Sequence, residues 1–246
     1  YIDNVLDREK DNDKVNVYIY DDYWELLHKH PKRKIETMCL ENNKQNEILQ
    51  DMKNFLKKET EEKYRRLGVC YKKNYLFWGY PGTGKSSLIY SLASELNMNI
   101  GFINFDSSFN DNVLMKSMIR APEDSIIVLE DIDSLFQERK KNDEHKNAVT
   151  LVGLLNTLDG IVHQDKQIII LTTNYKCHLD KALIRKGRID YMLEFGYAKK
   201  GQIKKMFLNF FPNCESQADK FYNKIKNLKV TTAVLQPYLF KHLDSD

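Results

Sequence analysis

Residues 75–87 read Tyr-Leu-Phe-Trp-Gly-Tyr-Pro-Gly-Thr-Gly-Lys-Ser-Ser, and the organisation of the whole chain follows from this stretch. Residues 75–78 form a short apolar run that predicts a buried strand. Residues 79–86 match the phosphate-loop pattern G-x-x-x-x-G-K-[ST] without a mismatch, and residues 86–96 predict a helix. A strand, a glycine turn and a helix in this order predict a nucleoside triphosphate site, because the glycines let the backbone approach phosphate oxygens and the helix directs its positive end toward them.

The residues of this turn have distinct expected roles. Lys85 is expected to place a point charge at the β- and γ-phosphates, and the Ser86 hydroxyl to ligate Mg²⁺. The alternative is an ordinary glycine turn, which the flanking strand and helix argue against. The predicted nucleotide-binding residues are Gly79, Tyr80, Pro81, Gly82, Thr83, Gly84, Lys85, Ser86 and Ser87.

Composition limits the possible classes of protein. The 246 residues can hold one α/β domain and a smaller second one. A net charge of +3, with both signs mixed along the chain, is too small to argue for nucleic-acid binding. The four cysteines are scattered and form no C-x-x-C pair, which favours reduced thiols over a metal site. No apolar run reaches the ~18 residues that span a bilayer. Because the chain begins at Tyr1, we expect a piece of a longer protein whose anchor is missing.

Strand and helix patterns alternate after the phosphate turn. Apolar runs predict strands at residues 75–78, 99–105, 125–130, 167–173 and 191–195, with helices at 113–120, 148–158 and 182–185. This alternation predicts an α/β fold with a five-stranded parallel sheet flanked by helices. From residue 200 onward the pattern is wholly helical, at 203–211, 218–228 and 232–242, which predicts a small C-terminal helical lid with a boundary near Ala198.

The segment before the phosphate turn is less regular. Residues 15–20 alternate as a strand does, and a lone strand needs a partner, so we expect them to end an upstream domain. The basic run at residues 29–34 contains Pro31 and is typical of a linker. Residues 46–64 carry apolar side chains at helical spacing and predict one amphipathic helix.

Two acids follow an apolar run at residues 126–131, which read Ile-Ile-Val-Leu-Glu-Asp. At the carboxyl end of a strand these acids are expected to lie beside the phosphate turn. Mg²⁺ takes hard oxygen ligands, and hydrolysis needs a group that positions the attacking water. We assign Glu130 to Mg²⁺ and Asp131 to the water, although either acid can serve as the base. Asp133 is expected to cap the next helix.

A polar residue ends the next apolar run, and two arginines follow. Residues 168–174 read Ile-Ile-Ile-Leu-Thr-Thr-Asn, so Asn174 is expected to hydrogen-bond the water or the γ-phosphate, with a simple turn residue as the alternative. Arg185 and Arg188 flank Gly187 and are spaced to present guanidinium groups at one surface. An arginine that reaches a transferring phosphoryl group accelerates the reaction about 10³–10⁵-fold, whereas surface solvation is the ordinary role.

The order of these motifs resembles the AAA module of the AAA+ ATPases, over about residues 35–242, and residues 179–190 resemble the family's second region of homology. The resemblance implies a Mg²⁺-dependent ATPase that binds ATP or ADP and forms a homo-oligomeric ring of about six or seven subunits, with each active site between two protomers. Asn174 would then be the first sensor. Arg185 and Arg188 would be arginine fingers that serve the neighbouring subunit's ATP.

Four features narrow the resemblance to one subfamily, the Bcs-type chaperones of the mitochondrial inner membrane, which move the folded Rieske iron–sulfur protein during complex III assembly. These features are the Glu130-Asp131 order, Gly-Thr-Gly-Lys-Ser-Ser at 82–87, Leu-Leu-Asn-Thr-Leu-Asp-Gly at 154–160 and Met-Phe-Leu-Asn-Phe-Phe-Pro at 206–212. The resemblance implies that residues 1–34 end an upstream middle domain and its linker, 35–198 form the P-loop ATPase subdomain and 199–246 the lid. Membrane attachment would come only from a segment upstream of Tyr1.

Departures from the family pattern bear on function. No aromatic–apolar–glycine pore loop stands between Phe105 and Arg120, which favours a folded or bulky client over a threaded chain. Thr231-Thr232-Ala233 stands where many AAA lids carry a nucleotide-sensing arginine. We therefore expect the ATP-hydrolysing module of a ring-forming protein remodeller or translocase, mitochondrial if truly Bcs-type and otherwise cytosolic or viral, with an unidentified client. The alternatives are a nucleic-acid motor or clamp-loader-like ATPase, for which no basic, aromatic track is seen, and a weakly hydrolysing nucleotide switch.

Overall fold

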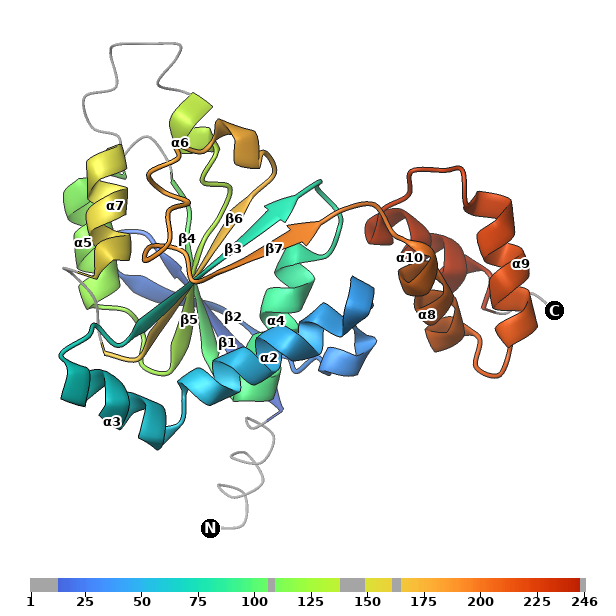
Figure 1. Cartoon of the computed structure of the whole chain (residues 1–246), viewed down its shortest axis with the longest axis horizontal. Helices are drawn as coiled ribbons and strands as arrows, with labels where there is room; N and C mark the ends of the chain where they lie inside the picture. Colours follow the sequence, from blue (N-terminus) through green and yellow to red (C-terminus); the bar gives the residue numbers. More distant parts are fainter. Residues whose placement is uncertain (1–12, 106–108, 138–148, 161–164, 244–246) are drawn as a thin grey trace.

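The computed structural model describes residues 13–105, 109–137, 149–160 and 165–243. Its centre is a seven-stranded sheet in the order β2-β1-β4-β5-β6-β3-β7, flanked by helices (Figure 1). The strands are β1 Lys14–Tyr20, β2 Trp24–Pro31, β3 Lys72–Gly79, β4 Asn99–Ile103, β5 Ser125–Leu129, β6 Gln167–Thr173 and β7 Tyr191–Phe195. The helices are α2 Lys44–Phe55, α3 Lys58–Leu67, α4 Lys85–Leu96, α5 Asp111–Ile119, α6 Ser134–Gln137, α7 Leu151–Asp159, α8 Lys200–Phe210, α9 Glu215–Ile225 and α10 Thr232–Lys241. Short 3₁₀ turns occur at Ile35–Thr37, Glu41–Asn43 and Lys176–His178.

The α/β class and the five predicted parallel strands, β3 to β7, are confirmed, but the predicted strand count is wrong because two further strands extend the sheet. The strand expected to belong to an upstream domain, β1, pairs in parallel with β4 and antiparallel with β2. Part of the predicted linker, Lys29 to Pro31, lies in β2. Pro31 is tolerated there because it is the last residue of an edge strand, where no neighbour requires its N–H.

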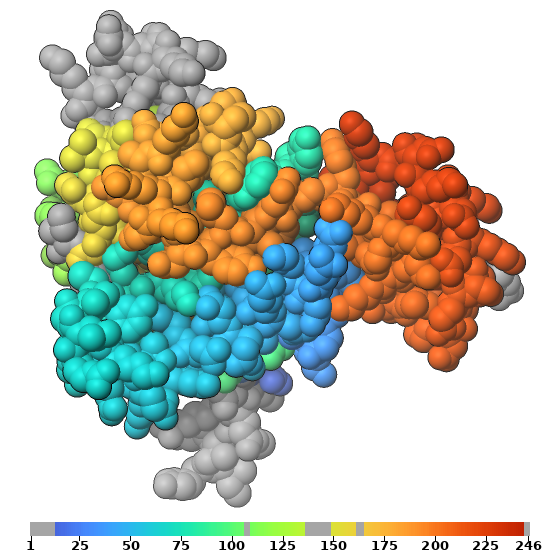
Figure 2. Space-filling model, viewed as in Figure 1, coloured from blue at the N-terminus to red at the C-terminus, as the bar shows by residue number. Residues whose placement is uncertain are grey.

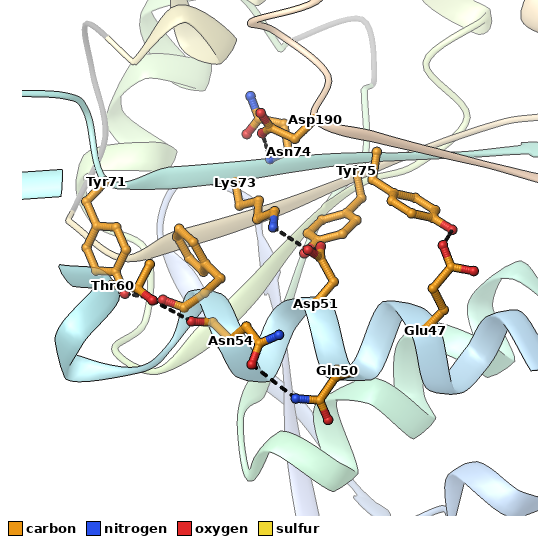
Figure 3. A network of polar contacts seen from close by, with 12 residues as sticks. Glu47, Gln50, Asp51, Asn54, Thr60, Tyr71, Lys73, Asn74, Tyr75 and Asp190 are labelled. Carbon is orange, nitrogen blue, oxygen red and sulfur yellow. Dashed lines mark hydrogen bonds and ion pairs between the residues drawn. The ribbon is translucent and has the colours of Figure 1, made fainter. Parts of the chain in front are cut away.

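The single helix predicted at residues 46–64 is two helices, α2 and α3, separated by the extended residue Lys57. The last carbonyls of α2 have side-chain partners, because Thr60 Oγ1 donates to the oxygen of Asn54 at 2.7 Å and the Tyr71 hydroxyl donates to the oxygen of Phe55 (Figure 3). These bonds satisfy the end of α2 and let the chain turn. The short helix predicted at 182–185 is likewise a series of turns.

The two faces of the sheet carry separate apolar clusters, and every residue of β5 and β6 is buried. Tyr75 and Phe77 belong to the cluster beneath α2 and α4, whereas Leu76 between them belongs to the cluster beneath α5 and α7. Because side chains alternate along a strand, β3 is covered on both faces, as parallel strands usually are. The carboxyl ends of β3, β5 and β6 are thereby held at one edge of the sheet.

The predicted helical lid consists of α8, α9 and α10 and forms a lobe beside the sheet domain (Figure 2). The residues just before α2 lie against it: Gln202 Nε2 donates to the oxygen of Cys39 at 2.9 Å, and Lys199 pairs with Glu41 at 2.7 Å. The lid also touches the phosphate turn, since the N–H of Ala233 donates to the oxygen of Gly82 at 3.0 Å. Within the described ranges no helix combines the length and apolar character needed to cross a bilayer.

Candidate nucleotide-binding site

The phosphate turn connects the end of β3 to the start of α4, and its three glycines, at positions 79, 82 and 84, all have positive φ. Gly79 has φ +137°, and a Cβ added there would lie 1.9 Å from the oxygen of Phe195 in β7. Gly82 has φ +72°, in the left-handed region that favours glycine. Within the turn, Thr83 Oγ1 donates to the oxygen of Tyr80 at 2.6 Å. The turn is therefore held by its own bonds and by β7, with the first turn of α4 behind it.

A cavity of about 330 Å³ lies over this turn. Its wall combines the phosphate turn with the ends of β5 and β6 and with the lid, and its polar groups converge from all three. The lining residues are Pro81, Gly82, Gly84, Lys85, Ser86, Ser87, Glu130, Asp131, Thr172, Asn174, Thr232, Ala233 and Gln236. Thr232, Ala233 and Gln236 come from α10. Nothing in the sequence predicts that they line the cavity; it shows only that residues 231–233 stand where many lids carry a nucleotide-sensing arginine.

Lys85 occupies the centre of the polar wall. Its Nζ donates to the oxygen of Gly79 at 2.7 Å, to the oxygen of Tyr80 at 3.2 Å and to Oδ1 of Asn174 at 2.8 Å. Burial lowers the pKa of Lys85 from its ordinary value, while the nearby carboxylate of Asp131 acts in the opposite direction. The ammonium group is thus fixed by oxygen acceptors at the mouth of the turn.

Asn174 connects this lysine to an acid. Its Nδ2 donates to Oδ1 of Asp131 at 3.1 Å, so one amide contacts both Lys85 and Asp131. Asp131 has φ +46°, an unusual backbone conformation for a non-glycine residue, and its N–H donates to Oγ1 of Thr172 at 3.0 Å. Local strain of this kind is often found at functional sites.

Asp133, for which the sequence suggested a helix cap, supports Asn174. Its Oδ1 accepts from the Oγ1 of Thr173 at 2.7 Å and from the N–H of Asn174 at 3.2 Å. Since Asp133 is buried, these bonds hold the end of β6 against the end of β5. The orientation of Asn174 is therefore set from behind as well as by Lys85 and Asp131.

Glu130 and Ser86 line the same cavity and offer oxygen atoms suited to Mg²⁺. Burial raises the pKa of Glu130, and the neighbouring charge of Asp131 adds to this rise. The described residues contain no cluster of three His, Cys, Asp or Glu side chains able to bind a metal. Mg²⁺ at triphosphate sites keeps water and phosphate oxygens as its other ligands, so one hydroxyl and one carboxylate fit such a site.

The two predicted arginines lie away from this cavity, and their environments differ. Arg188 forms a two-pronged ion pair with Asp159, at 2.6 and 2.8 Å, and its Nη1 donates to the oxygen of Ala182 at 2.9 Å. The bond with Arg188 lowers the pKa of Asp159, and the same bond raises that of Arg188. The side chain of Arg185 contacts no polar partner in the described part of the chain. Asp159 belongs to the 154–160 motif, but the sequence did not indicate this pairing.

Two stretches discussed from the sequence are only partly described. Residues 106–108, within the segment that lacks a pore-loop pattern, lie outside the described residues, as do residues 1–12 of the predicted upstream segment.

Two family models match the chain. Residues 75–197 match the ATPase family associated with various cellular activities, and residues 200–246 match the ATPase lid domain of mitochondrial chaperone BCS1-like proteins. The first model spans the phosphate turn, both acids, Asn174 and the two arginines. The second spans the lid.

Individual relatives are similar over most of this chain. Probable mitochondrial chaperone BCS1-B of Dictyostelium discoideum is 35% identical, covering 95% of this chain and 58% of the relative. Mitochondrial chaperone BCS1 of Homo sapiens is 33% identical over 84% of this chain and 51% of the relative. AAA-ATPase At2g18193 of Arabidopsis thaliana is 32% identical over 88% of this chain and 46% of the relative. The chain thus spans about half the length of the curated relatives it matches.

Proposed function

The chain belongs to the AAA family of ATPases and carries a lid of the BCS1-like type, and from this premise we propose that it hydrolyses ATP as one subunit of a ring-forming protein remodeller or translocase. The family match confirms the resemblance inferred from the order of motifs. The observation that carries the proposal is the continuous set of contacts from Lys85 through Asn174 to Asp131 along the wall of one cavity.

These contacts support a direct division of roles in hydrolysis. Lys85 and the N–H groups of the turn bind the phosphates, and the Asn174 amide, held between Lys85 and Asp131, orients the attacking water toward the γ-phosphorus. Asp131 accepts the proton of that water as its oxygen bonds to phosphorus. The bond from the γ-phosphorus to the bridging oxygen breaks, and ADP leaves with the electron pair.

Ser86 and Glu130 would hold Mg²⁺, which neutralises charge on the phosphates. The raised pKa of Glu130 is consistent with this role, because a half-buried carboxylate beside Asp131 benefits from a nearby cation. Asp131 would remain the group that accepts the proton, since Asn174 holds its carboxylate beside Lys85.

Arg185 is proposed to reach the nucleotide of the neighbouring subunit. It lies in a turn away from its own cavity, and its side chain has no polar partner in the described part of the chain. Arg188, which was predicted to act in the same way, holds Asp159 and the oxygen of Ala182 within its own subunit. We therefore assign Arg188 to anchoring the loop that carries Arg185. Each active site would then contain groups from two subunits.

Two relatives similar to this chain are named mitochondrial chaperones, and we propose the same class of role here, in mitochondria at the inner membrane, on a protein client. A ring of identical subunits would couple hydrolysis to movement of that client, because the arginine of each subunit contacts the γ-phosphate only while ATP is present in the next.

Nucleotide binding tests the core of this proposal. Lys85→Ala should weaken binding of a non-hydrolysable ATP analogue with Mg²⁺ by about 100-fold or more, because charge-assisted contacts to the phosphates are lost. Isothermal titration calorimetry measures this directly. Lys53→Ala, at an exposed position of α2, is the matched control and should bind as wild type. Equal affinity of the Lys85→Ala variant and the control would refute the assignment of the cavity.

A further inference from the structure

Asn74 is a fully buried polar residue in the first half of β3, away from the phosphate turn. Its backbone is paired with one residue of the loop before β7: the N–H of Asn74 donates to Oδ2 of Asp190 at 2.8 Å, and the N–H of Asp190 donates to the oxygen of Asn74 at 2.9 Å. Figure 3 shows Asn74 and Asp190 on one side of β3, with Lys73, Tyr75 and Asp51 on the other.

The side chain of Asn74 contacts two further segments. Its Nδ2 donates to the oxygen of Arg188 at 2.7 Å and to the oxygen of Leu158 at 3.1 Å. Leu158 directly precedes Asp159, the partner of Arg188. One amide group therefore holds the main chain on both sides of the Arg188–Asp159 ion pair and ties it to the central sheet.

This bonding pattern requires an amide. An apolar residue at position 74 would leave two carbonyl oxygens without the donors they have here, and a carboxylate has no N–H to give. The remaining acceptor, Oδ1 of Asn74, is buried and has no partner among the described residues. A buried polar atom without a partner costs stability, so a residue that served only to fill space would be better apolar at this position.

We infer that Asn74 is a positioning residue for the arginine loop: it fixes residues 185–188 so that Arg185 is presented to the neighbouring subunit's nucleotide. This inference rests on the proposed shared active site. It extends that proposal by naming the residue that makes the loop a rigid part of the sheet. Asp190 has the matching backbone role on the same side of β3.

A mixed-ring assay separates the two functions of a subunit. Lys85→Ala subunits cannot bind nucleotide but can donate an arginine, whereas Arg185→Ala subunits bind nucleotide but cannot donate. In an equal mixture about a quarter of the sites should be active, because half of the subunits bind ATP and half of their neighbours donate. Failure of this mixture to recover turnover would overturn the shared site and, with it, the role of Asn74.

The Asn74→Ala variant should bind nucleotide normally and donate poorly. We expect turnover to recover when it is mixed with Lys85→Ala, which supplies the arginine. Mixed with Arg185→Ala, it should remain about 10-fold to 100-fold below a mixture of wild type with Arg185→Ala, because a displacement of about 1 Å in a reacting group costs that much. Suppose that the mixture of Asn74→Ala with Arg185→Ala turned over as fast as the mixture of wild type with Arg185→Ala, while the mixture of Lys85→Ala with Arg185→Ala was active. The role of Asn74 would then be overturned, and the shared site would stand.

A structural defect would have a different signature, since a misfolded subunit fails with both partners. That result would also overturn a positioning role. Asn74→Ser keeps one donor and should fold more readily, with a loss of donation between those of wild type and Asn74→Ala. Tyr75→Phe is the matched control: it removes a part-buried hydrogen bond to Asp51 at the next position of β3, on the other side of the strand, and should behave as wild type in both mixtures.

Discussion

The two halves of β3 carry the two parts of the proposed active site, and they are held in different ways. At the carboxyl end, Lys85 is bonded to two carbonyls of the turn and to the amide of Asn174, all beside an open cavity. In the first half, Asn74 and Asp190 join a loop whose Arg188 is already paired with Asp159. The partners of Lys85 are neutral oxygens, whereas the partner of Arg188 is a carboxylate.

This difference indicates how a shared site can work. A phosphate competes readily with neutral oxygens for a lysine ammonium, so the end that accepts nucleotide can exchange its partners. A two-pronged ion pair backed by main-chain bonds is far harder to displace, so the end that donates an arginine is assembled in advance. If the site is shared as proposed, the acceptor half would adapt to nucleotide and the donor half would remain fixed by the fold.

The largest effect is expected from removing the acid at the acceptor end. Asp131→Asn should lower the rate of phosphate release about 10²–10³-fold, because a positioned base contributes on that order, while affinity for an ATP analogue changes little. Glu130→Gln is the matched control and should weaken Mg²⁺-dependent binding instead. If the two variants showed the opposite pattern, the roles of the two acids would have to be exchanged.

A smaller loss is expected from opening the donor end. Asp159→Asn keeps the size of the side chain but removes the charge that pairs with Arg188, so turnover of the assembled ring should fall about 10-fold to 100-fold with nucleotide affinity unchanged. Asp219→Asn removes the charge from a single-pronged, more exposed ion pair with Lys204 in the lid and should be silent. Wild-type turnover in the Asp159→Asn ring would show that the arginine loop does not need its anchor.

The ion pair between Arg188 and Asp159 also predicts how its contribution to stability changes with pH. Because the bond with Arg188 lowers the pKa of Asp159, the carboxylate remains charged as pH falls through the ordinary range of aspartate. The contribution of this ion pair to the stability of the folded state is therefore fully present above the unfolded-state pKa of Asp159. It is lost only as pH falls through the lowered folded-state pKa of that carboxyl.

Strands β3 to β7 and the acceptor end could be predicted because their signals are local. Each core strand is a short apolar run, and the polar residues that follow β5 and β6 meet beside the turn wherever parallel strands are neighbours. The break between α2 and α3 was not predicted, because the helical spacing of apolar residues continues across it. The end of α2 depends on the hydrogen bonds that Thr60 and Tyr71 donate to its last carbonyl oxygens.

The donor end was only half predictable. The two arginines are recognisable by their spacing, but Asn74 and Asp159 matter through partners far along the chain: Asn74 is separated by 84 residues from Leu158 and by 114 from Arg188. The partner of β1 is equally distant, in β4. No local pattern encodes such pairings. Gln236 reaches the cavity only because the lid folds back over the phosphate turn.

The side of β3 opposite Asn74 supports the fold without belonging to either half of the site. Oδ2 of Asp51 accepts from the hydroxyl of Tyr75 at 2.7 Å, and its Oδ1 pairs with Lys73 at 2.6 Å (Figure 3). Burial raises the pKa of Tyr75, so the hydroxyl stays protonated and remains a donor. Asp51→Ala leaves this donor unpaired and should lower the free energy of unfolding by about 1–2 kcal/mol.

Chemical denaturation measures the effect of Asp51→Ala, and turnover per folded subunit should stay at the wild-type level. Glu47→Ala is the milder control. Glu47 lies in the same helix as Asp51, and its exposed carboxylate accepts a hydrogen bond from the Tyr191 hydroxyl. A loss of turnover in folded Asp51→Ala protein would mean that both sides of β3 serve the site.

The smallest effect is expected at the lid, which contacts the residues before α2 and, of the two halves of the site, the phosphate turn of the acceptor half. Thr232 Oγ1 and the N–H of Ala233 both donate to the oxygen of Gly82, at 3.1 and 3.0 Å. Thr232→Val keeps the shape and removes one donor, at a cost of about 1 kcal/mol, so hydrogen exchange in the first turn of α10 should quicken about fivefold. Exchange at Asn74 should not change. Thr231→Val, one residue earlier and without a described side-chain hydrogen bond, is the control. Equal exchange in the two variants would show that the lid is held independently of the turn, and the acceptor half would then have to adapt to nucleotide without moving it.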